Sequence, residues 1–269
     1  MPTKNSFTHH IQLKTNNMNN LNINYNRIED LKRLEFIKNT FQSFENKKLN
    51  VLDVGCGNGN ISRYIGSFGH KVLGIDISKS SIDKANSLNS LDNVTFKNIP
   101  AEQIDPEMKY DLIICSEVIE HLHIPNLVVN TLRNKLTKDG VLIITVPNGY
   151  GPREVLITKP VQFIMEYLPG TFKVLNAVKS SLGFKGTTVQ SDAEDLKHIQ
   201  FFSKKSLLNM ATSNNLKLTN FRSSNFIESV FPFSLITKKS RMLQKLDCWV
   251  ADQIPHQFAS GFMSAWKLK

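Results

Sequence analysis

The sequence predicts an α/β fold of the doubly wound type, with a Rossmann-like seven-stranded sheet that is mostly parallel and has an antiparallel C-terminal strand. Short apolar runs alternate with helical patterns up to residue 146, as is typical of βαβ units in a parallel sheet. The stretch VLDVGCGNGN at residues 51–60 places three glycines between a strand and a helix. A strand, a glycine-rich turn and a helix together make a nucleotide-binding corner in such sheets.

The spacing of apolar residues locates the individual elements. Apolar residues at helical spacing predict a helix ahead of the sheet, and a serine cap predicts the start of a helix near residue 203. The last two strands are expected to pair antiparallel at the edge of the sheet. The expected strands are 51–54, 71–76, 94–98, 110–115, 140–146, 216–221 and 262–268, and the expected helices are 26–44, 60–68, 79–88, 126–135 and 203–211.

The organisation along the chain predicts one domain with two insertions. Residues 1–24 lack periodicity and are expected to form a flexible tail, whereas residues 25–269 form the domain. Insertions at residues 148–198 and 223–260 interrupt it. The first contains short amphipathic patterns at residues 161–168 and 172–182 and follows a strand end, where ligands bind in open α/β sheets. We expect it to form a substrate lid, or else to pack on the domain. With Lys159, Lys173 and Lys179 it could also contact a membrane surface.

Composition restricts the class of protein. The chain has 269 residues, a formal net charge of +10 and a pI near 9.4, which favour anionic partners such as nucleic acid, acidic lipid or a phosphorylated substrate. A lysine- and asparagine-rich proteome would give the same charge. Cys56, Cys115 and Cys248 lie far apart and form no disulfide or zinc pattern, so a reducing, cytoplasmic location is expected. No apolar run is long enough for a transmembrane helix, and no secretory signal is expected at the N-terminus.

The glycine loop excludes two common nucleotide sites. Gly55, Gly57 and Gly59 put the third glycine one position too early for the dinucleotide pattern G-x-G-x-x-G, because Asn60 stands in its place. The phosphate-loop pattern G-x-x-x-x-G-K-[ST] is also missing. A different nucleotide ligand is therefore expected, and an NAD-dependent oxidoreductase is the less favoured alternative.

Two acidic residues follow the first two strands. Asp53 ends the first strand, and Asp76 lies seventeen residues after Gly59, where an acid meets ribose hydroxyls in nucleotide-binding sheets. Ile77 would then pack on the adenine. Each acid has a plainer interpretation, since a carboxylate at a strand end often caps a loop or a helix, and Ser78 is placed to cap the next helix.

A cluster of ionisable residues follows the fourth strand, in the stretch YDLIICSEVIEHL. If Glu117 opens a helical turn, Glu120 and His121 share its face. Neighbouring carboxylates repel one another unless a positive group lies between them, and a divalent cation such as Mg²⁺ or Mn²⁺ accepts oxygen and imidazole ligands. His198 precedes the helix near residue 203 and is expected over the same face. His121 could instead act as a general base, or simply pack.

These motifs resemble those of class I S-adenosylmethionine (SAM)-dependent methyltransferases. The glycine loop with Asp53 is similar to the first motif of that family, and the E-x-x-E-H stretch with a downstream histidine resembles two of its groups. These groups are the ubiquinone-biosynthesis O-methyltransferases and the small-RNA 3′-end 2′-O-methyltransferases. The resemblance implies metal ligation by Glu117, Glu120, His121 and His198.

The resemblance also implies a cofactor site. Residues 31–37 resemble the R-L-x-x-I helix of the quinone group, so Arg33 could meet the SAM carboxylate, although a solvated arginine is the plainer interpretation. Ala101 and Glu102 follow the third strand, where this fold places donors near adenine. The implied cofactor-binding residues are Arg33, Asp53, Gly55, Cys56, Gly57, Gly59, Asp76, Ile77, Ala101, Glu102, Ser116 and Glu117.

The expected activity is that of a transferase that methylates an oxygen of a small molecule, namely a quinone, lipid or glycan precursor. Glu120 and His121 are the expected catalytic residues. Two alternatives stay open: an RNA 2′-O-methyltransferase that uses a divalent metal, and a non-catalytic SAM-binding module. Peripheral membrane contact is a further possibility for the first insertion.

Overall fold

The computed structural model describes residues 21–23, 25, 27–45, 47–167, 198–228, 230, 233–237 and 239–269. The expected helical pattern at residues 172–182, with Lys173 and Lys179, lies outside these residues, as does most of the expected tail. Within the tail, residues 21–23 differ from the expectation, because Ile23 is buried and Asn22 bonds to the backbone of Leu88.

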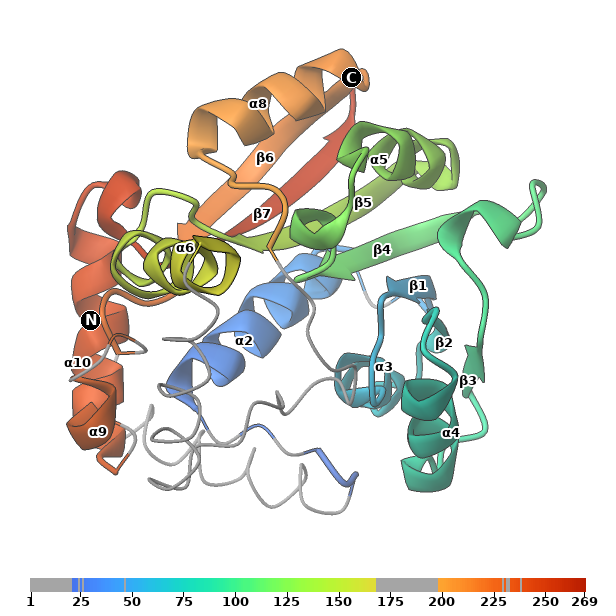
Figure 1. The fold of residues 1–269 in the computed structure, drawn as a ribbon. Coiled ribbons are helices and arrows are strands. Elements are labelled where there is room, and N and C mark those ends of the chain that lie inside the picture. The colour runs from blue at the N-terminus through green and yellow to red at the C-terminus, as the bar shows by residue number, and fades with distance from the viewer. Residues whose placement is uncertain are drawn as a thin grey trace.

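One seven-stranded sheet runs through the molecule in the order β3-β2-β1-β4-β5-β7-β6 (Figure 1). Strands β1 to β5 are parallel to one another, and β7 is antiparallel to both β5 and β6. This order confirms the predicted fold class. The strands are β1 (Asn50–Val54), β2 (Lys71–Ile75), β3 (Val94–Lys97), β4 (Tyr110–Ser116), β5 (Leu136–Pro147), β6 (Leu216–Ser223) and β7 (Gly261–Leu268).

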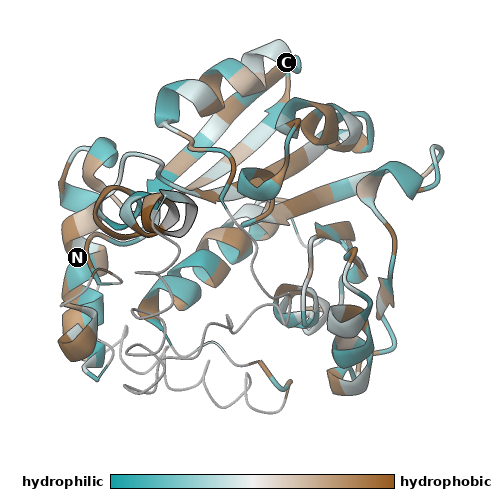
Figure 2. Ribbon diagram, in the orientation of Figure 1, coloured by the Kyte–Doolittle hydropathy of each residue, from teal (hydrophilic) through white to brown (hydrophobic). Residues whose placement is uncertain are grey.

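Helices cover both faces of the sheet because side chains alternate between its two sides along each strand. On one face, α2 (Ile28–Gln42), α3 (Asn60–Gly66) and α4 (Lys79–Leu88) share a core with residues such as Val51 and Leu112. On the other, α5 (Pro125–Asn134) and α8 (Lys204–Ser213) pack on Leu52, Ile113 and Trp266. Figure 2 shows apolar residues concentrated in the central strands.

Most sequence-predicted elements are confirmed within a few residues at their ends. The largest shift is β5, which begins at Leu136 because it pairs with Tyr110 before a bulge. The predicted antiparallel pair is also confirmed, with β6 at the edge and the C-terminal strand β7 inside the sheet.

The two insertions flank the carboxyl ends of β4 and β5. The first begins with a π-helix, η3 (Glu154–Thr158), and continues into α6 (Lys159–Tyr167). The second contains α9 (Ser234–Thr237), α10 (Arg241–Gln253) and the short helix η4 (His256–Phe258). Helix α10 packs along α2, where the backbone N–H of Ile28 donates to Gln244 at 3.1 Å. Both insertions therefore border the edge at which the predicted site lies.

Candidate functional site

The glycine loop turns sharply between β1 and α3. Gly55 and Gly59 have φ angles of +66° and +74°, a region that disfavours other residues, and a Cβ atom would strike Val118 at the first position and the Phe96 ring at the second. Arg63 on α3 stabilises the loop, because its fully buried guanidinium donates to the carbonyl of Asn58 at 2.6 Å. Between these glycines, the N–H of Cys56 donates to the carbonyl of Ile75 at 3.0 Å and connects the loop at Cys56 and Gly57 to the end of β2.

Asp53 and Asp76 take different roles. Asp53 is buried beneath the loop and accepts a 2.6 Å hydrogen bond from the Ser62 hydroxyl, and its burial raises its pKa to about 7. The donor in this contact is a side-chain hydroxyl on α3 and not an N–H group of the loop. Asp76 is half-buried at the end of β2 and accepts from the N–H groups of Gly57 at 2.9 Å and Ser78 at 2.8 Å.

Asp76 can nevertheless accept more hydrogen bonds, because a carboxylate has about four lone-pair sites. Ile77, next to it, is 77 % exposed and offers an apolar surface at the loop. Ala101 and Glu102 lie in η1 (Ala101–Gln103) after β3, the first buried and the second exposed. These residues follow the ends of β2 and β3, beside the glycine loop after β1.

Arg33 is buried rather than solvated, so the solvated interpretation was wrong. Its guanidinium lies 3.7 Å from the Glu117 carboxylate, and its Nη1 is buried without a hydrogen-bond partner in the described part of the chain. Both side chains line a small polar cavity between α2 and β7, together with Arg153 and Asn225.

Glu117 does not open a helical turn, contrary to the condition set in the sequence analysis. Its φ of +56° is left-handed, and the helical turn η2 (Ile119–His121) begins two residues later. Its carboxylate accepts from the Thr145 hydroxyl at 2.8 Å, and this hydroxyl also bonds to Ser116. Glu117 thus faces Arg33 and β5, and it is not among the described residues whose potential ligand atoms all lie within 4.8 Å of one another, unlike Glu120 and His121.

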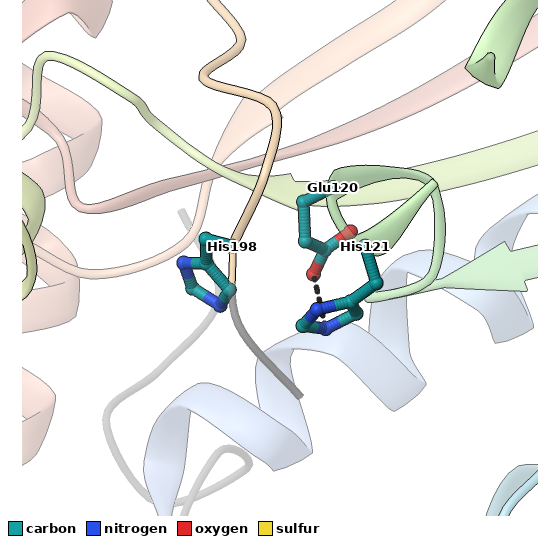
Figure 3. Close-up of side chains that lie close together, drawn as sticks. All are labelled: Glu120, His121 and His198. Carbon is teal, nitrogen blue, oxygen red and sulfur yellow. Dashed lines mark ion pairs between the residues drawn. The ribbon is translucent and has the colours of Figure 1, made fainter. Parts of the chain in front are cut away.

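Glu120, His121 and His198 form a close group (Figure 3). One potential ligand atom from each residue lies within 4.8 Å of the others, and the two imidazole rings are 5.2 Å apart. Glu120 is 1 % exposed, and neither of its carboxyl oxygens has a hydrogen-bond partner among the described residues. Its burial, and then the charge of Glu117, raise its pKa well above the usual value. We call these three residues the Glu-His-His group.

Backbone contacts bring these distant residues together. The carbonyl of Glu120 accepts from the N–H groups of Ile199 at 2.8 Å and Gln200 at 2.9 Å, which places His198 beside η2. Farther along, Asn148 forms an isolated parallel bridge with Phe202. The segment before α8 is therefore fixed against the ends of β4 and β5, as predicted for His198.

Glu154 is the residue that the sequence analysis missed. It lies in the first turn of η3, is completely buried, and places Oε1 3.3 Å from Nδ1 of His198. An acid at the head of the apolar run Val155-Leu156-Ile157, seven residues after the end of β5, was the available signal. It lies beside the Glu-His-His group and adds a second buried carboxylate to it.

The donor atoms of the group suit a divalent cation. Oε1 of Glu120 lies 3.8 Å from Nε2 of His121 (Figure 3), but neither carboxyl oxygen has a hydrogen-bond partner among the described residues. Such a buried carboxylate is costly unless a positive charge compensates it, and oxygen plus imidazole is a ligand set that Mg²⁺, Mn²⁺ and other divalent ions accept. Glu120, His121 and His198 are thus able to hold such an ion. Each of the two imidazoles, when neutral, also has one ring nitrogen that can accept a proton, so they are able to take part in proton transfer.

Comparison with known proteins places these features in context. Residues 25–220 match the family model described as "Methyltransferase domain". The ubiquinone biosynthesis O-methyltransferases of Glaesserella parasuis and Bordetella avium are each 29 % identical over 158 and 154 residues, which is 55 % of this chain. The aligned part spans 66 % and 63 % of their own lengths, slightly less than two thirds. The same enzyme of Pelagibacter ubique is 30 % identical over 61 % of this chain and 69 % of its own.

Solved structures share the fold. Magnesium protoporphyrin IX methyltransferase from Synechocystis, with bound S-adenosylhomocysteine (SAH), has a TM-score of 0.52 at 15 % identity and covers 89 % of this chain and 84 % of its own. The plantazolicin methyltransferase BpumL, with a substrate analogue and SAH, has a TM-score of 0.52 at 19 % identity, covering 90 % and 85 %. Among the described helices, none is both long and apolar enough to cross a membrane.

Proposed function

Because this chain belongs to the methyltransferase-domain family, we propose that it transfers a methyl group from SAM to a hydroxyl oxygen of a small molecule, such as a quinone, lipid or glycan precursor. One observation carries the proposal. The glycine loop and the Glu-His-His group follow the neighbouring parallel strands β1 and β4, so they share one edge of the sheet. A cofactor in the loop and an acceptor at the group would be adjacent.

The loop side of this edge fits SAM. The methyl group of SAM is bonded to a sulfonium and is therefore electrophilic when the cofactor binds. Gly55, Gly57 and Gly59 let the backbone approach the ligand closely, Asp76 accepts the ribose hydroxyls, and Ile77 packs on the base. Arg33 has a buried, unpartnered nitrogen within the described structure and is the candidate for the SAM carboxylate.

The Glu-His-His group acts on the acceptor. His121 is a general base for the hydroxyl proton, because a neutral imidazole has one ring nitrogen that can accept a proton. Alternatively, Glu120, His121 and His198 hold a divalent cation, which makes a bound hydroxyl easier to deprotonate. Either role needs the group to face the methyl donor, and in-line alignment then contributes a large part of the rate.

The insertions are the proposed substrate lid. Helix α6 lies beside this edge, and Lys159 at its start sits over the rings of Tyr150 and Phe201, 4.8 Å from each ring centre. Lys159 thus contacts two aromatic rings of the domain, which argues against its part in a membrane patch. Cys56, Cys115 and Cys248 are free thiols, consistent with the proposed cytoplasmic location.

A second candidate is RNA 2′-O-methylation. It is favoured by the position of His198 beside Glu120 and His121, as the resemblance implied, and by the net charge of +10. The metal would then bind the terminal hydroxyls of the RNA.

Two substitutions test the proposed roles. Transfer of labelled methyl from SAM to extract of the source cell should fall about 100-fold or more in Glu120→Gln and His121→Ala, since general-base catalysis contributes about 10²–10⁴-fold. SAH affinity, measured by calorimetry, should stay within about threefold because the cofactor contacts lie elsewhere. His123→Ala is the matched control, an exposed histidine two residues away. Wild-type rates in both variants would remove this group from the mechanism.

A further inference from the structure

We propose that Glu154 is a positioning residue, which holds the His198 imidazole so that its Nε2 faces Glu120 and His121. The inference rests on the proposed function only in taking the Glu-His-His group as the place where a cation or an acceptor binds. Glu154 is completely buried, and its Oε1 lies 3.3 Å from Nδ1 of His198. Neither carboxyl oxygen makes a hydrogen bond to a described residue, and the ion pair with His198 is the polar contact that the described residues give this carboxylate. The carboxylate is therefore oriented toward His198.

The two nitrogens of His198 face different ways. In Figure 3, one ring nitrogen of His198 points toward His121 and the other points away. Because Nδ1 is the atom near Glu154, Nε2 is the one that faces the group. A carboxylate that accepts a hydrogen bond from Nδ1–H fixes the imidazole lone pair on Nε2, since a neutral imidazole carries only one N–H, and this lone pair is the one able to bind a cation or accept a proton.

Glu154 acts through His198 rather than as a direct ligand. The set of potential ligand atoms that lie within 4.8 Å of one another contains Glu120, His121 and His198, and Glu154 is not in it. Paired carboxylate and histidine are a recurrent arrangement around metal sites, where the carboxylate fixes the ring orientation and makes the imidazole more basic.

The backbone around Glu154 is anchored. The N–H of Val155 donates to the carbonyl of Gly151 at 3.0 Å, and a Cβ on Gly151 would strike the carbonyl of Ala259 in the loop before β7. The Asn148 side chain donates to the same Ala259 carbonyl at 2.7 Å. The first turn of η3 is thus attached to the loop before β7, while His198 is attached to η2 through Glu120. Glu154 and His198 join these two anchored segments.

The test combines a tautomer measurement with cation affinity. In protein labelled with ¹⁵N-histidine, free of metal and SAM, NMR at neutral pH should show His198 with its proton on Nδ1. Glu154→Leu removes the acceptor at similar volume, so the proton should shift toward Nε2 and the Kd for Mn²⁺, measured by EPR, should rise about 10- to 100-fold. Glu154→Gln keeps an acceptor oxygen, so its Kd for Mn²⁺ should rise less than that of Glu154→Leu. Glu107→Gln, at an exposed glutamate, is the control and should match wild type.

The outcomes separate this inference from the proposed function. A wild-type His198 protonated on Nε2, or a Glu154→Leu variant with unchanged tautomer and Mn²⁺ affinity, would overturn the role of Glu154. If Glu154→Leu does not fold, the wild-type tautomer and the Glu154→Gln affinity decide. The wild-type protein could instead show the proton on Nδ1 of His198 and yet neither bind Mn²⁺ nor transfer methyl. This result would support the Glu154 contact and count against the proposed function.

Discussion

Asp53 and Asp76 end neighbouring strands, yet the structure gives them different environments. Asp53 lies under the loop with Ser62, whereas Asp76 reaches the loop backbone at Gly57 and stays half-buried. The sequence predicts both positions, because an acid after an apolar run marks a strand end. It does not predict their burial, which depends on how α3 packs on the sheet.

Asp76 is expected to contribute directly to cofactor affinity. Asp76→Ala removes a charged acceptor for the ribose hydroxyls, and hydrogen bonds to charged groups contribute about 1.5–3 kcal/mol, so the Kd for SAH should rise about 10- to 100-fold. Calorimetry with SAH measures this change. Asp83→Ala is the control, an exposed aspartate on α4 that pairs with Lys79. Equal SAH affinity in Asp76→Ala and wild type would refute the ribose contact.

Asp53 is expected to make stability depend on pH. Its pKa is raised by burial from 3.8 to about 7, so the folded state retains a proton that the unfolded chain releases. Stability is therefore greatest below the unfolded pKa and declines as pH rises from about 4 to 7, by on the order of a few kcal/mol. Asp53→Asn imitates the protonated form, so the stability of this variant should decline much less over the same pH range.

Denaturant unfolding of the protein without cofactor at pH 4, 5.5 and 7 measures the effect of Asp53. The difference in unfolding free energy between wild type and Asp53→Asn should shift in favour of the variant as pH rises. A difference that stays constant across this range would contradict the raised pKa.

Among the elements, the turn after β4 is where local pattern reasoning fails. The spacing of Glu117, Glu120 and His121 suits one face of a helix, but the left-handed backbone at Glu117 turns its side chain toward Thr145 and Arg33. This conformation is enforced by β5 and α2, which lie far away in sequence. The proximity of His198 was predictable from topology, since parallel strands end at one edge. The approach of Glu154 depends on η3, a π-helix that precedes the expected helical pattern at residues 161–168.

Gly149 tests how the segments at this edge support the Glu-His-His group. Its N–H donates to the carbonyl of Phe202 at 2.8 Å, and a Cβ atom would lie 2.6 Å from the Phe201 Cα. Gly149→Ala should push away the segment that carries His198 and weaken Mn²⁺ binding about tenfold or more, while SAH affinity is retained. Titration by EPR and calorimetry separates the two effects.

Gly69→Ala is the control for Gly149→Ala. Gly69 has a φ of +85° and open space around its Cβ position, so alanine there costs about 1 kcal/mol of strain without touching the site. Full Mn²⁺ affinity in Gly149→Ala would show that the bridge between Asn148 and Phe202 does not position His198.

For the whole molecule, the C-terminal strand is part of the central core. Strand β7 inserts between β5 and β6, and its Trp266 is completely buried. The alternation of apolar residues predicts the strand itself. The expected antiparallel edge pair left the order of the two strands open, because local pattern carries no information on strand order. Local pattern does not predict the packing of residues 21–23 either, because the guanidinium of Arg63, which is distant in sequence, donates to the carbonyls of Leu21 and Asn22.

The two tryptophans provide a matched test of this arrangement. Trp266→Ala should lower the free energy of unfolding by about 3–5 kcal/mol through loss of buried surface and the cavity left behind. Trp249→Ala, on the outer face of α10 with 59 % exposure, should change it by about 0.5 kcal/mol or less. Denaturant unfolding compares the two variants. Similar losses in both would contradict the burial of β7.

The central claim is that this fold carries SAM-dependent methyl transfer to a small hydroxyl compound. The most direct test is transfer of labelled methyl from SAM to a fractionated extract of the source cell, with Mg²⁺ or Mn²⁺ added. We predict label in solvent-extractable or small soluble material. Label in precipitable material that RNase removes would identify an RNA 2′-O-methyltransferase instead, and SAM binding with no label in any fraction would contradict the claim in favour of a non-catalytic SAM-binding module.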